Sequence, residues 1–257
     1  LGILNATPDS FSDGVRFLDP ARAVARGLEM ASEGADALDV GGESTRPGAT
    51  PVTEAEELAR VLPVIEGLKK RTDLPVSIDT RRAAVAQAAL AAGASIVNDI
   101  TALADPGMRA VVKESGAEVI LMHMQGEPGS MQADPRYGDV VTEVRDFLVS
   151  RARQAEAEGI SKSKIILDPG IGFGKTLEHN LQLLRRLPEL VAAWYPVLVG
   201  PSRKAFIGKI LDLSVSDRLE GTAAAVACAV MGGAAWVRVH DVQSMARVVR
   251  VAEAIRG

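Results

Sequence analysis

The stretch Gly34-Ala35-Asp36-Ala37-Leu38-Asp39 is one of four places where Gly-Ala leads into a short apolar run that ends at a polar or charged residue. The other three copies occupy residues 93–99, 116–123 and 233–240. Glycine suits the left-handed position just past a helix, and continuous aliphatic residues are typical of a parallel strand buried on both faces. Each copy therefore predicts a passage from helix to strand, with a hydrogen-bonding side chain at the end of the strand.

Four more apolar runs follow the same rule without the Gly-Ala lead, and they end at Asn5, Asp79, Asp168 and Gly200. Segments with helical periodicity separate the eight runs. Eight alternations in 257 residues predict a single (β/α)₈ barrel domain over residues 1–257, of α/β class, with its active site at the C-terminal ends of the strands. A doubly wound open sheet is the competing architecture, but it usually needs fewer strands.

The composition fits one globular domain and argues against several classes of protein. With 47% hydrophobic residues the chain can bury a large core. Its net charge is −4 and it has no Lys/Arg run, so we expect no nucleic-acid partner and no membrane partner. The single cysteine, Cys228, is predicted to be a small core residue. The chain starts inside its first predicted strand without a signal peptide, so we expect a missing natural N-terminus and a cytoplasmic location.

Two long polar loops follow predicted strand ends. The first is Asn5-Ala6-Thr7-Pro8-Asp9-Ser10-Phe11-Ser12-Asp13-Gly14, which is rich in turn-forming residues. The second is Gly41-Gly42-Glu43-Ser44-Thr45-Arg46-Pro47-Gly48, which offers glycines, two hydroxyls and an arginine. Long loops in compact domains are often functional, although a capped connection or a solvated surface loop could have the same composition.

A third segment, Asp168-Pro169-Gly170-Ile171-Gly172-Phe173-Gly174-Lys175-Thr176, ends like a phosphate-binding P-loop. That motif requires glycine five residues before Gly174, where this chain has Pro169, and the proline ring also removes an N–H donor. A P-loop nucleotidase is therefore disfavoured. We predict instead that Asp168 accepts a pair of N–H groups from a ligand, with the glycines bringing the backbone close to that ligand.

Six blocks of the sequence together resemble the dihydropteroate synthases, occur in the order typical of that family, and cover essentially the whole chain. They are residues 5–14, 39–48, 121–126, 167–175, 202–204 and 238–241. The resemblance implies an eight-stranded barrel transferase of folate biosynthesis. Such an enzyme joins (hydroxymethyl)dihydropterin diphosphate to para-aminobenzoate and releases diphosphate with the help of Mg²⁺. The family resemblance also implies a homodimer that forms through the outer helices.

The resemblance implies a pterin pocket, and the chemistry of the candidate residues suits it. A carboxylate such as Asp168 can accept the amino group and the neighbouring ring N–H of a pterin as a two-pronged pair. Asn98 can both donate and accept, which suits the mixed edge of the same ring. By resemblance the pocket also contains Asp79, Met122 and Lys204, and Lys204 would border the aminobenzoate as well.

The resemblance further implies that Arg238, His240 and Thr45 hold the diphosphate and that Asn5 ligates the magnesium. Alternation along a strand places Arg238 and His240 on one face. Lys204, Arg238 and His240 are the predicted catalytic residues, and we expect them to act by electrostatics and positioning, without a covalent enzyme intermediate. The residues predicted around the aminobenzoate and in the two long loops are Phe11, Ser44, Arg46, Pro47, Phe173 and Ser202.

Two positions depart from the family pattern. Val15 follows Asp13-Gly14 where relatives commonly have glycine, and Ala205 follows Lys204 where many relatives carry serine. Both departures bear on the affinity for aminobenzoate and on the response to sulfonamides, and neither touches the pterin residues.

Two other classes of function remain open from the sequence. A pterin-binding methyltransferase module of the corrinoid type would share the barrel and the pterin pocket, but it would have no use for Arg238 and His240 as a diphosphate site. A catalytically silent binding or scaffold protein would not need the set of polar residues at the strand ends.

Overall fold

Parallel strands alternate with helices along the whole chain in the computed structural model, which describes residues 1–7, 19–44 and 50–257. Strands β1 to β6 pair in chain order in one sheet, and β7 pairs with β8. The strands in the described residues are β1 (Gly2–Asn5), β2 (Leu38–Gly41), β3 (Val76–Asp79), β4 (Ile96–Asp99), β5 (Glu118–Met122), β6 (Ile165–Asp168), β7 (Leu198–Val199) and β8 (Trp236–Val237).

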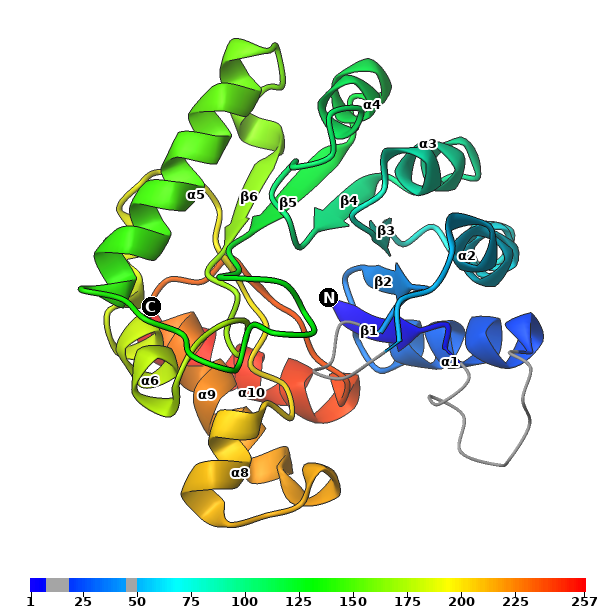
Figure 1. Cartoon of the computed structure of the whole chain (residues 1–257). Helices are drawn as coiled ribbons and strands as arrows, with labels where there is room; N and C mark the ends of the chain where they lie inside the picture. Colours follow the sequence, from blue (N-terminus) through cyan, green and yellow to red (C-terminus); the bar gives the residue numbers. More distant parts are fainter. Residues whose placement is uncertain (8–18, 45–49) are drawn as a thin grey trace.

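Two contacts close these sheets into a barrel. A parallel bridge joins Leu167 of β6 to Val197, just before β7, and another joins Gly2 of β1 to Val239, just after β8. The amide of Ile3 donates to the carbonyl of Val239 at 2.9 Å. The last strand therefore lies beside the first, which confirms the predicted (β/α)₈ barrel over the open sheet (Figure 1).

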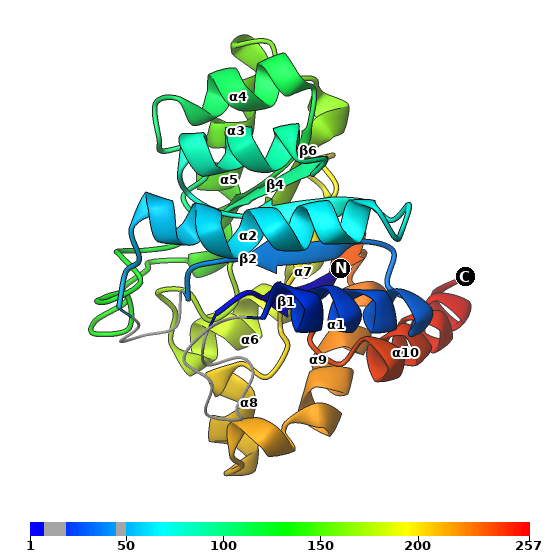
Figure 2. The same ribbon diagram turned by 90° about the vertical axis from the view of Figure 1, so that its right-hand side faces the viewer.

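The helices form the outer layer around the strands, and α1 to α4 lie side by side in chain order (Figure 2). Two helices rather than one connect β6 to β7, and two connect β7 to β8. The helices in the described residues are α1 (Pro20–Ser32), α2 (Glu54–Lys69), α3 (Ala83–Ala91), α4 (Met108–Ser115), α5 (Val140–Ala157), α6 (Leu177–Arg185), α7 (Leu187–Val191), α8 (Ala205–Leu211), α9 (Leu219–Met231) and α10 (Val242–Arg256), with short 3₁₀ turns at Lys162–Lys164 and Val215–Asp217.

The glycines of the four Gly-Ala pairs have the backbone conformation that the sequence predicted. Their φ angles are +100° at Gly34, +109° at Gly93, +66° at Gly116 and +93° at Gly233. A side chain is strained at such angles, so glycine lets the chain leave each helix and turn into the next strand.

The strands separate two apolar layers. A small cluster fills the barrel interior near the N-terminal ends of the strands, and a larger one lies between the strands and the helices. On β5, Ile120 belongs to the inner cluster and Leu121 to the outer one, as alternation along a strand requires. The inner cluster consists of Leu1, Ala37, Ile96, Ile120, Ile166 and Leu198. Two residues after Ala37, Ile96 and Ile166, the next inward positions are polar and hold Asp39, Asn98 and Asp168. These polar side chains therefore lie closer to the C-terminal ends of the strands than the apolar cluster does.

Two details differ from the sequence predictions. Strand β2 continues past Asp39 to Gly41, so Asp39 lies inside the barrel rather than at the strand end. Cys228 is exposed, not a core residue. It lies on α9, whose buried face consists of Thr222, Ala225, Val226, Ala229 and Val230. The helix is so rich in alanine that its two faces hardly differ in hydrophobicity, and the sequence pattern could not show which face is buried.

Within the described residues, no helix is both long enough and apolar enough to span a membrane.

Candidate active site

A cavity of about 490 Å³ opens at the C-terminal ends of the strands, where the barrel fold places ligands. The described part of the second long loop borders it, as do the segments that follow β6 and β7. The sequence-predicted residues that line it are Asn5, Ser44, Asp79, Phe173, Ser202, Lys204, Arg238 and His240.

Three further predicted residues lie at the ends of β4, β5 and β6. Asn98, Met122 and Asp168 are buried, and Met122 is the register partner of Asp168 on the neighbouring strand. Asp79 is likewise the register partner of Asn98. The four predicted pterin residues of β3 to β6 therefore follow one another around the barrel. The predictions for Phe11, Thr45, Arg46, Pro47 and Val15 lie outside the described residues.

An ion-pair network connects the last strand to the middle of the sheet. Nε of Arg238 donates to Oδ2 of Asp39 at 2.5 Å, and its Nη2 donates to Oδ2 of Asp79 at 2.7 Å. Nδ2 of Asn98 donates to the same Oδ2 of Asp39 at 3.0 Å. These contacts use two of the five N–H donors of the guanidinium, which leaves others with which Arg238 can meet an anion.

Asp39 is a site residue that the sequence prediction left out. Its side chain is fully buried, and its Oδ1 atom has no hydrogen-bond partner among the residues that the structure describes. A buried carboxylate needs a charged or hydrogen-bonding partner, and Arg238 supplies it. The signal in the sequence was an aspartate inside an otherwise apolar strand. Its partner could not be read from the pattern.

Burial and neighbouring charges shift the ionisation of this network. Burial raises the pKa of Asp79 to about 7, although Arg238 lowers it, and the nearby carboxylate of Asp39 raises it further. Burial alone would lower the pKa of Arg238, but the carboxylates of Asp39 and Asp79 raise it above its ordinary value. Arg238 is therefore a permanent cation, whereas Asp79 titrates near neutral pH.

Asp168 is held in a fixed orientation at the end of β6. Its Oδ1 accepts the backbone N–H of Gly170 at 2.7 Å. Burial raises its pKa, whereas the Gly170 hydrogen bond and the charge of Lys204 lower it. An ionised carboxylate has about four lone-pair positions, so this single internal bond leaves capacity for a ligand's N–H pair.

The glycines after Asp168 mainly permit a close approach of two loops. A Cβ on Gly170, whose φ is +66°, would meet the carbonyl oxygen of His123, and one on Gly174, whose φ is +59°, would meet that of Gln125. Only Gly172 of the three lines the cavity. In this structure Gly170 and Gly174 allow the loop to pack against the segment after β5, and the closeness of these glycines to a ligand stays a prediction.

Lys175, the lysine of the P-loop-like sequence, is buried and joins the same two loops. Its Nζ lies 3.1 Å from Nδ1 of His123, and it donates to the carbonyls of His123 at 3.2 Å and Phe173 at 2.9 Å. Three acceptors match the three donors of an ammonium group. Burial lowers the pKa of Lys175 to about 7 and that of His123 to about 3, so the imidazole is neutral. The lysine thus stabilises the loop, which agrees with the rejection of a P-loop.

The three residues of the segment Ser202-Arg203-Lys204 make contacts in three different places. Oγ of Ser202 lies 2.9 Å from Nδ1 of His240 and accepts the backbone N–H of His240 at 3.2 Å. Arg203 pairs with Asp241 instead, at 2.5 Å between Nη2 and Oδ1. Nζ of Lys204 lies 4.1 Å from the ring centroid of Phe173, within the range of a cation–π contact. Ser202 therefore orients His240, while Lys204 and Phe173 form one wall of the cavity.

The described part of the chain contains no group of three or more His, Cys, Asp or Glu side chains that could hold a metal ion. Asn5 offers one amide oxygen at the cavity. Because Mg²⁺ often binds through one or two protein ligands together with substrate phosphates, Asn5 fits an ion that is bound jointly with a diphosphate.

A closed barrel with buried carboxylates and cationic side chains at the C-terminal strand ends has the architecture of the (β/α)₈ enzymes, which carry their active sites at this end. Residues 1–240 match the family of pterin binding enzymes. The chain is 50% identical over 257 residues to a dihydropteroate synthase of Synechocystis, covering 99% of this chain and 89% of that protein. It is 46% identical over 254 residues to the Escherichia coli enzyme, covering 99% and 90%.

Solved structures agree with these relatives. The dihydropteroate synthase of Yersinia pestis with a sulfonamide drug has a TM-score of 0.95 and 46% identity, over 99% of this chain and 93% of that one. The Xanthomonas albilineans enzyme with 7,8-dihydropteroate has a TM-score of 0.91 and 45% identity, over 100% and 92%. The chain therefore belongs to the dihydropteroate synthases, within the pterin-binding enzyme family. These relatives support the first interpretation of the sequence, and not the corrinoid-type methyltransferase.

Proposed function

We propose that this chain condenses (hydroxymethyl)dihydropterin diphosphate with para-aminobenzoate, giving dihydropteroate and diphosphate. The observation that carries this proposal is the division of the site into two chemically different parts. The buried side chains of Asn98 and Asp168 lie at the ends of β4 and β6, whereas Lys204, Arg238 and His240 line the open cavity. Relatives crystallised with 4-aminobenzoic acid and with 7,8-dihydropteroate support the same substrates.

In this proposal the pterin ring lies over the ends of β3 to β6. Asp168 accepts the amino group and the ring N–H, and Asn98 meets the mixed edge beside it. Asp79 contributes a second carboxylate, and Met122 provides an apolar surface for the flat ring. Hydrogen bonds of this kind, made in a buried pocket, select a pterin because an analogue lacking the donors would leave the carboxylates unpaired.

The diphosphate lies against Arg238 and His240, with Thr45 as a further predicted contact. Ser202 holds the ring of His240 in place through the 2.9 Å contact with Nδ1. Asn5 would hold Mg²⁺ through its amide oxygen, and the bound ion would neutralise part of the charge on the leaving group. The protein's own cations stabilise the same developing charge from fixed positions, which costs no reorganisation during the reaction.

We propose that diphosphate departs before the arylamine attacks and that no covalent enzyme intermediate forms. Electron release from the pterin ring can stabilise the cation left at the methylene carbon, so a nucleophilic side chain is not needed. Lys204, Arg238 and His240 then act by electrostatics, and the aminobenzoate approaches past Phe173 and Ser44.

We further propose a homodimer formed through the outer helices and a cytoplasmic location. The exposed large apolar side chains on α8, α9 and α10 are Ile210, Leu211, Leu219, Met231, Val251 and Ile255. Apolar side chains of this kind become buried when a dimer forms. Light scattering after size-exclusion chromatography measures the oligomeric state directly.

Release of diphosphate in the presence of both substrates and Mg²⁺ tests the proposed reaction. We expect release to depend on para-aminobenzoate and the product to have the mass of dihydropteroate. Reactions without the arylamine or without the protein are the controls. A protein that binds the pterin but never releases diphosphate would be a binding protein, and the proposal would be wrong.

A further inference from the structure

One cluster of charged side chains holds both ends of the second long loop. Glu43 lies two residues after the end of β2, and Val52 lies immediately before Thr53, the N-cap of α2. The segment between them begins with Ser44, which lines the cavity and which the proposed function places beside the aminobenzoate. How its two ends are held therefore bears on the second substrate.

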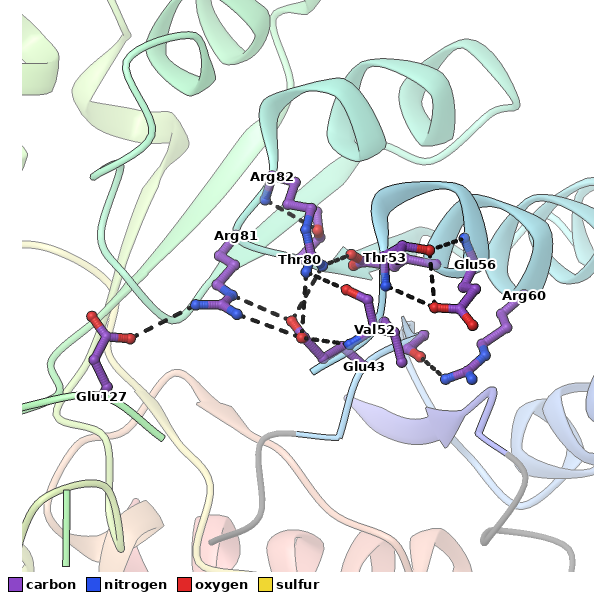
Figure 3. Close-up of polar contacts among 11 residues, drawn as sticks. Glu43, Val52, Thr53, Glu56, Arg60, Thr80, Arg81, Arg82 and Glu127 are labelled. Atoms are coloured by element: carbon purple, nitrogen blue, oxygen red, sulfur yellow. Dashed lines mark hydrogen bonds and ion pairs between the residues drawn. The ribbon is translucent and has the colours of Figure 1, made fainter. Parts of the chain in front are cut away.

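Glu43 and Arg82 connect the two ends directly. Oε1 of Glu43 accepts the backbone N–H of Val52 at 3.3 Å, and Nη2 of Arg82 donates to the carbonyl of Val52 at 2.7 Å. Arg82 also contacts the carboxylate of Glu43 through Nη1 and Nη2, at 3.3 and 3.4 Å. Figure 3 shows these side chains meeting between the start of the loop and its end. We name Glu43 and Arg82 the loop clamp.

The loop clamp is tied to the strand that delivers Asp79 to the site. Arg81 and Arg82 follow Asp79 after a single residue, and Nε of Arg81 donates to Oε2 of Glu43 at 3.3 Å. Strand β3 is itself held between β2 and β4, and the Asp79 carboxylate accepts from Arg238, so the arginines after β3 hold Glu43 while Asp79 is held independently of it.

The burial and charge of the cluster make the clamp stiff. The side chain of Glu43 is 9% exposed and that of Arg82 is 21% exposed. Arg82 also forms an ion pair with Glu57 of α2, whose side chain is only 1% exposed. The carboxylates of Glu43 and Glu57 face the two guanidinium groups, with the exposed Glu127 as a third partner on the Arg81 side. The partly buried pairs among them are screened by solvent much less than surface pairs.

We infer that Glu43 and Arg82 are positioning residues for the second substrate, because they hold Ser44 and the end of the loop at Val52 against β3. This inference rests on the proposed function, in which Ser44 borders the aminobenzoate. Among the proposed pterin residues, Asp79 is held by Arg238, and Asn98 and Asp168 bond to Asp39 and Gly170 rather than to the clamp. The clamp should accordingly affect aminobenzoate binding and leave pterin binding nearly unchanged.

Steady-state kinetics of Glu43→Gln and Arg82→Lys test the inference. Glutamine keeps an acceptor for the N–H of Val52 but loses the ion pairs, and lysine keeps the charge but loses the planar fork that spans both partners. For each variant we expect the KM for aminobenzoate to rise about tenfold, since small displacements of positioning groups have effects of at least this size. The KM for the pterin diphosphate should stay within about twofold of wild type.

Glu56→Ala is the matched control. Glu56 belongs to the capping box of α2, where it accepts from the N–H of Thr53 at 2.8 Å, and it makes no contact with Arg81 or Arg82 in Figure 3. Its loss should weaken the cap at the start of α2 and lower the melting temperature slightly, while leaving both KM values unchanged. Glu43→Gln alone suffices for the test if Arg82→Lys fails to fold because of the buried Glu57.

The outcomes separate the inference from the proposed function. Wild-type protein that releases no diphosphate would refute the proposed function by itself. With an active wild type, an aminobenzoate KM that rises no more in Glu43→Gln than in Glu56→Ala would overturn the clamp. An equal rise in the KM for the pterin would overturn it too, because the effect would then be a general loosening of the barrel.

Discussion

The guanidinium of Arg238 and the carboxylate of Asp39 meet at 2.5 Å between Nε and Oδ2, although the two residues are 199 positions apart in the chain. The pair joins the last part of the barrel to its second strand and lies directly beneath the cavity. It therefore combines a structural role, the neutralisation of a fully buried carboxylate, with the placement of the cation proposed to bind diphosphate.

Asp39→Asn tests this double role. The amide cannot balance the charge of Arg238 as a carboxylate does, so we expect a loss of roughly 2–4 kcal/mol in the free energy of unfolding. Urea unfolding measures it. Glu29→Gln, which breaks an exposed pair with Arg26, is the control and should cost less than about 1 kcal/mol. Equal small losses in both variants would mean that the buried pair adds nothing to stability.

Asp168→Asn should weaken the binding of the pterin. The substitution replaces one acceptor oxygen with an amide that faces the donors of the ring, so an attraction becomes a clash. Hydrogen bonds to charged groups contribute roughly 1.5–3 kcal/mol, which corresponds to at least about a tenfold loss of affinity. Calorimetric titration with a pterin measures the change. Unaltered affinity would remove Asp168 from the pterin site.

The raised pKa of Asp79 predicts a pH-dependent stability. Its pKa is about 7 in the folded protein, against an ordinary value of 3.8. Between these two values the folded state retains a proton that the unfolded state has lost, so this group's contribution to stability falls as the pH rises from about 4 to 7.

Asp79→Asn cannot titrate and should escape that loss. When the pH is raised from 5 to 8, the stability of the variant relative to wild type should increase by on the order of 1–4 kcal/mol, because each pKa unit corresponds to 1.36 kcal/mol. Thermal unfolding at both pH values checks the sign. If the two proteins showed the same pH dependence, the carboxylate of Asp79 would not be the titrating group.

Ser202→Ala distinguishes positioning from covalent catalysis. A serine close to a histidine resembles a nucleophile with its base, but Oγ of Ser202 also accepts the backbone N–H of His240. We expect turnover to fall by less than about 100-fold, whereas removal of a true serine nucleophile costs on the order of 10⁶-fold. Mass spectrometry of wild-type protein with the pterin diphosphate alone should also detect no adduct. A loss near 10⁶-fold, or an adduct at Ser202, would contradict the mechanism.

Magnesium and diphosphate should strengthen the binding of the second substrate. We expect a sulfonamide or para-aminobenzoate to bind about 5- to 150-fold more tightly when both are present, which is the usual range of coupling between ligands. Chelation of the metal with diphosphate still present should remove much of that gain. Identical dissociation constants under the three conditions would show that the aminobenzoate pocket forms independently of the anion.

Local sequence patterns predicted the barrel because each of them reports a local physical constraint. A positive φ demands glycine, so Gly34, Gly93, Gly116 and Gly233 marked four turns into strands. Strands buried on both faces must be aliphatic, so a polar residue that ends such a run, such as Asp79 or Asp168, stood out as a candidate ligand-binding residue.

Two kinds of sequence pattern could not be interpreted in this way: helices whose faces hardly differ in hydrophobicity, and residues whose role depends on partners elsewhere in the fold. The buried face of the alanine-rich helix α9 was decided by packing, and this placed Cys228 on the surface. The sequence disfavoured a P-loop but did not show the role of Lys175, whose three acceptors from His123 and Phe173 are supplied by the fold.

The sequence by itself determined the order of strands and helices, the side of the barrel that carries the site, and most of the polar residues there, since these follow from the preferences of neighbouring residues. Only the tertiary structure decided which charges pair. Arg238 meets Asp39 and Asp79 because barrel closure brings the end of β8 close to β2 and β3, and Arg82 meets Glu43 because the pairing of β2 with β3 brings their following loops together. An ion pair depends on distance in space, and separation along the chain carries almost no information about it.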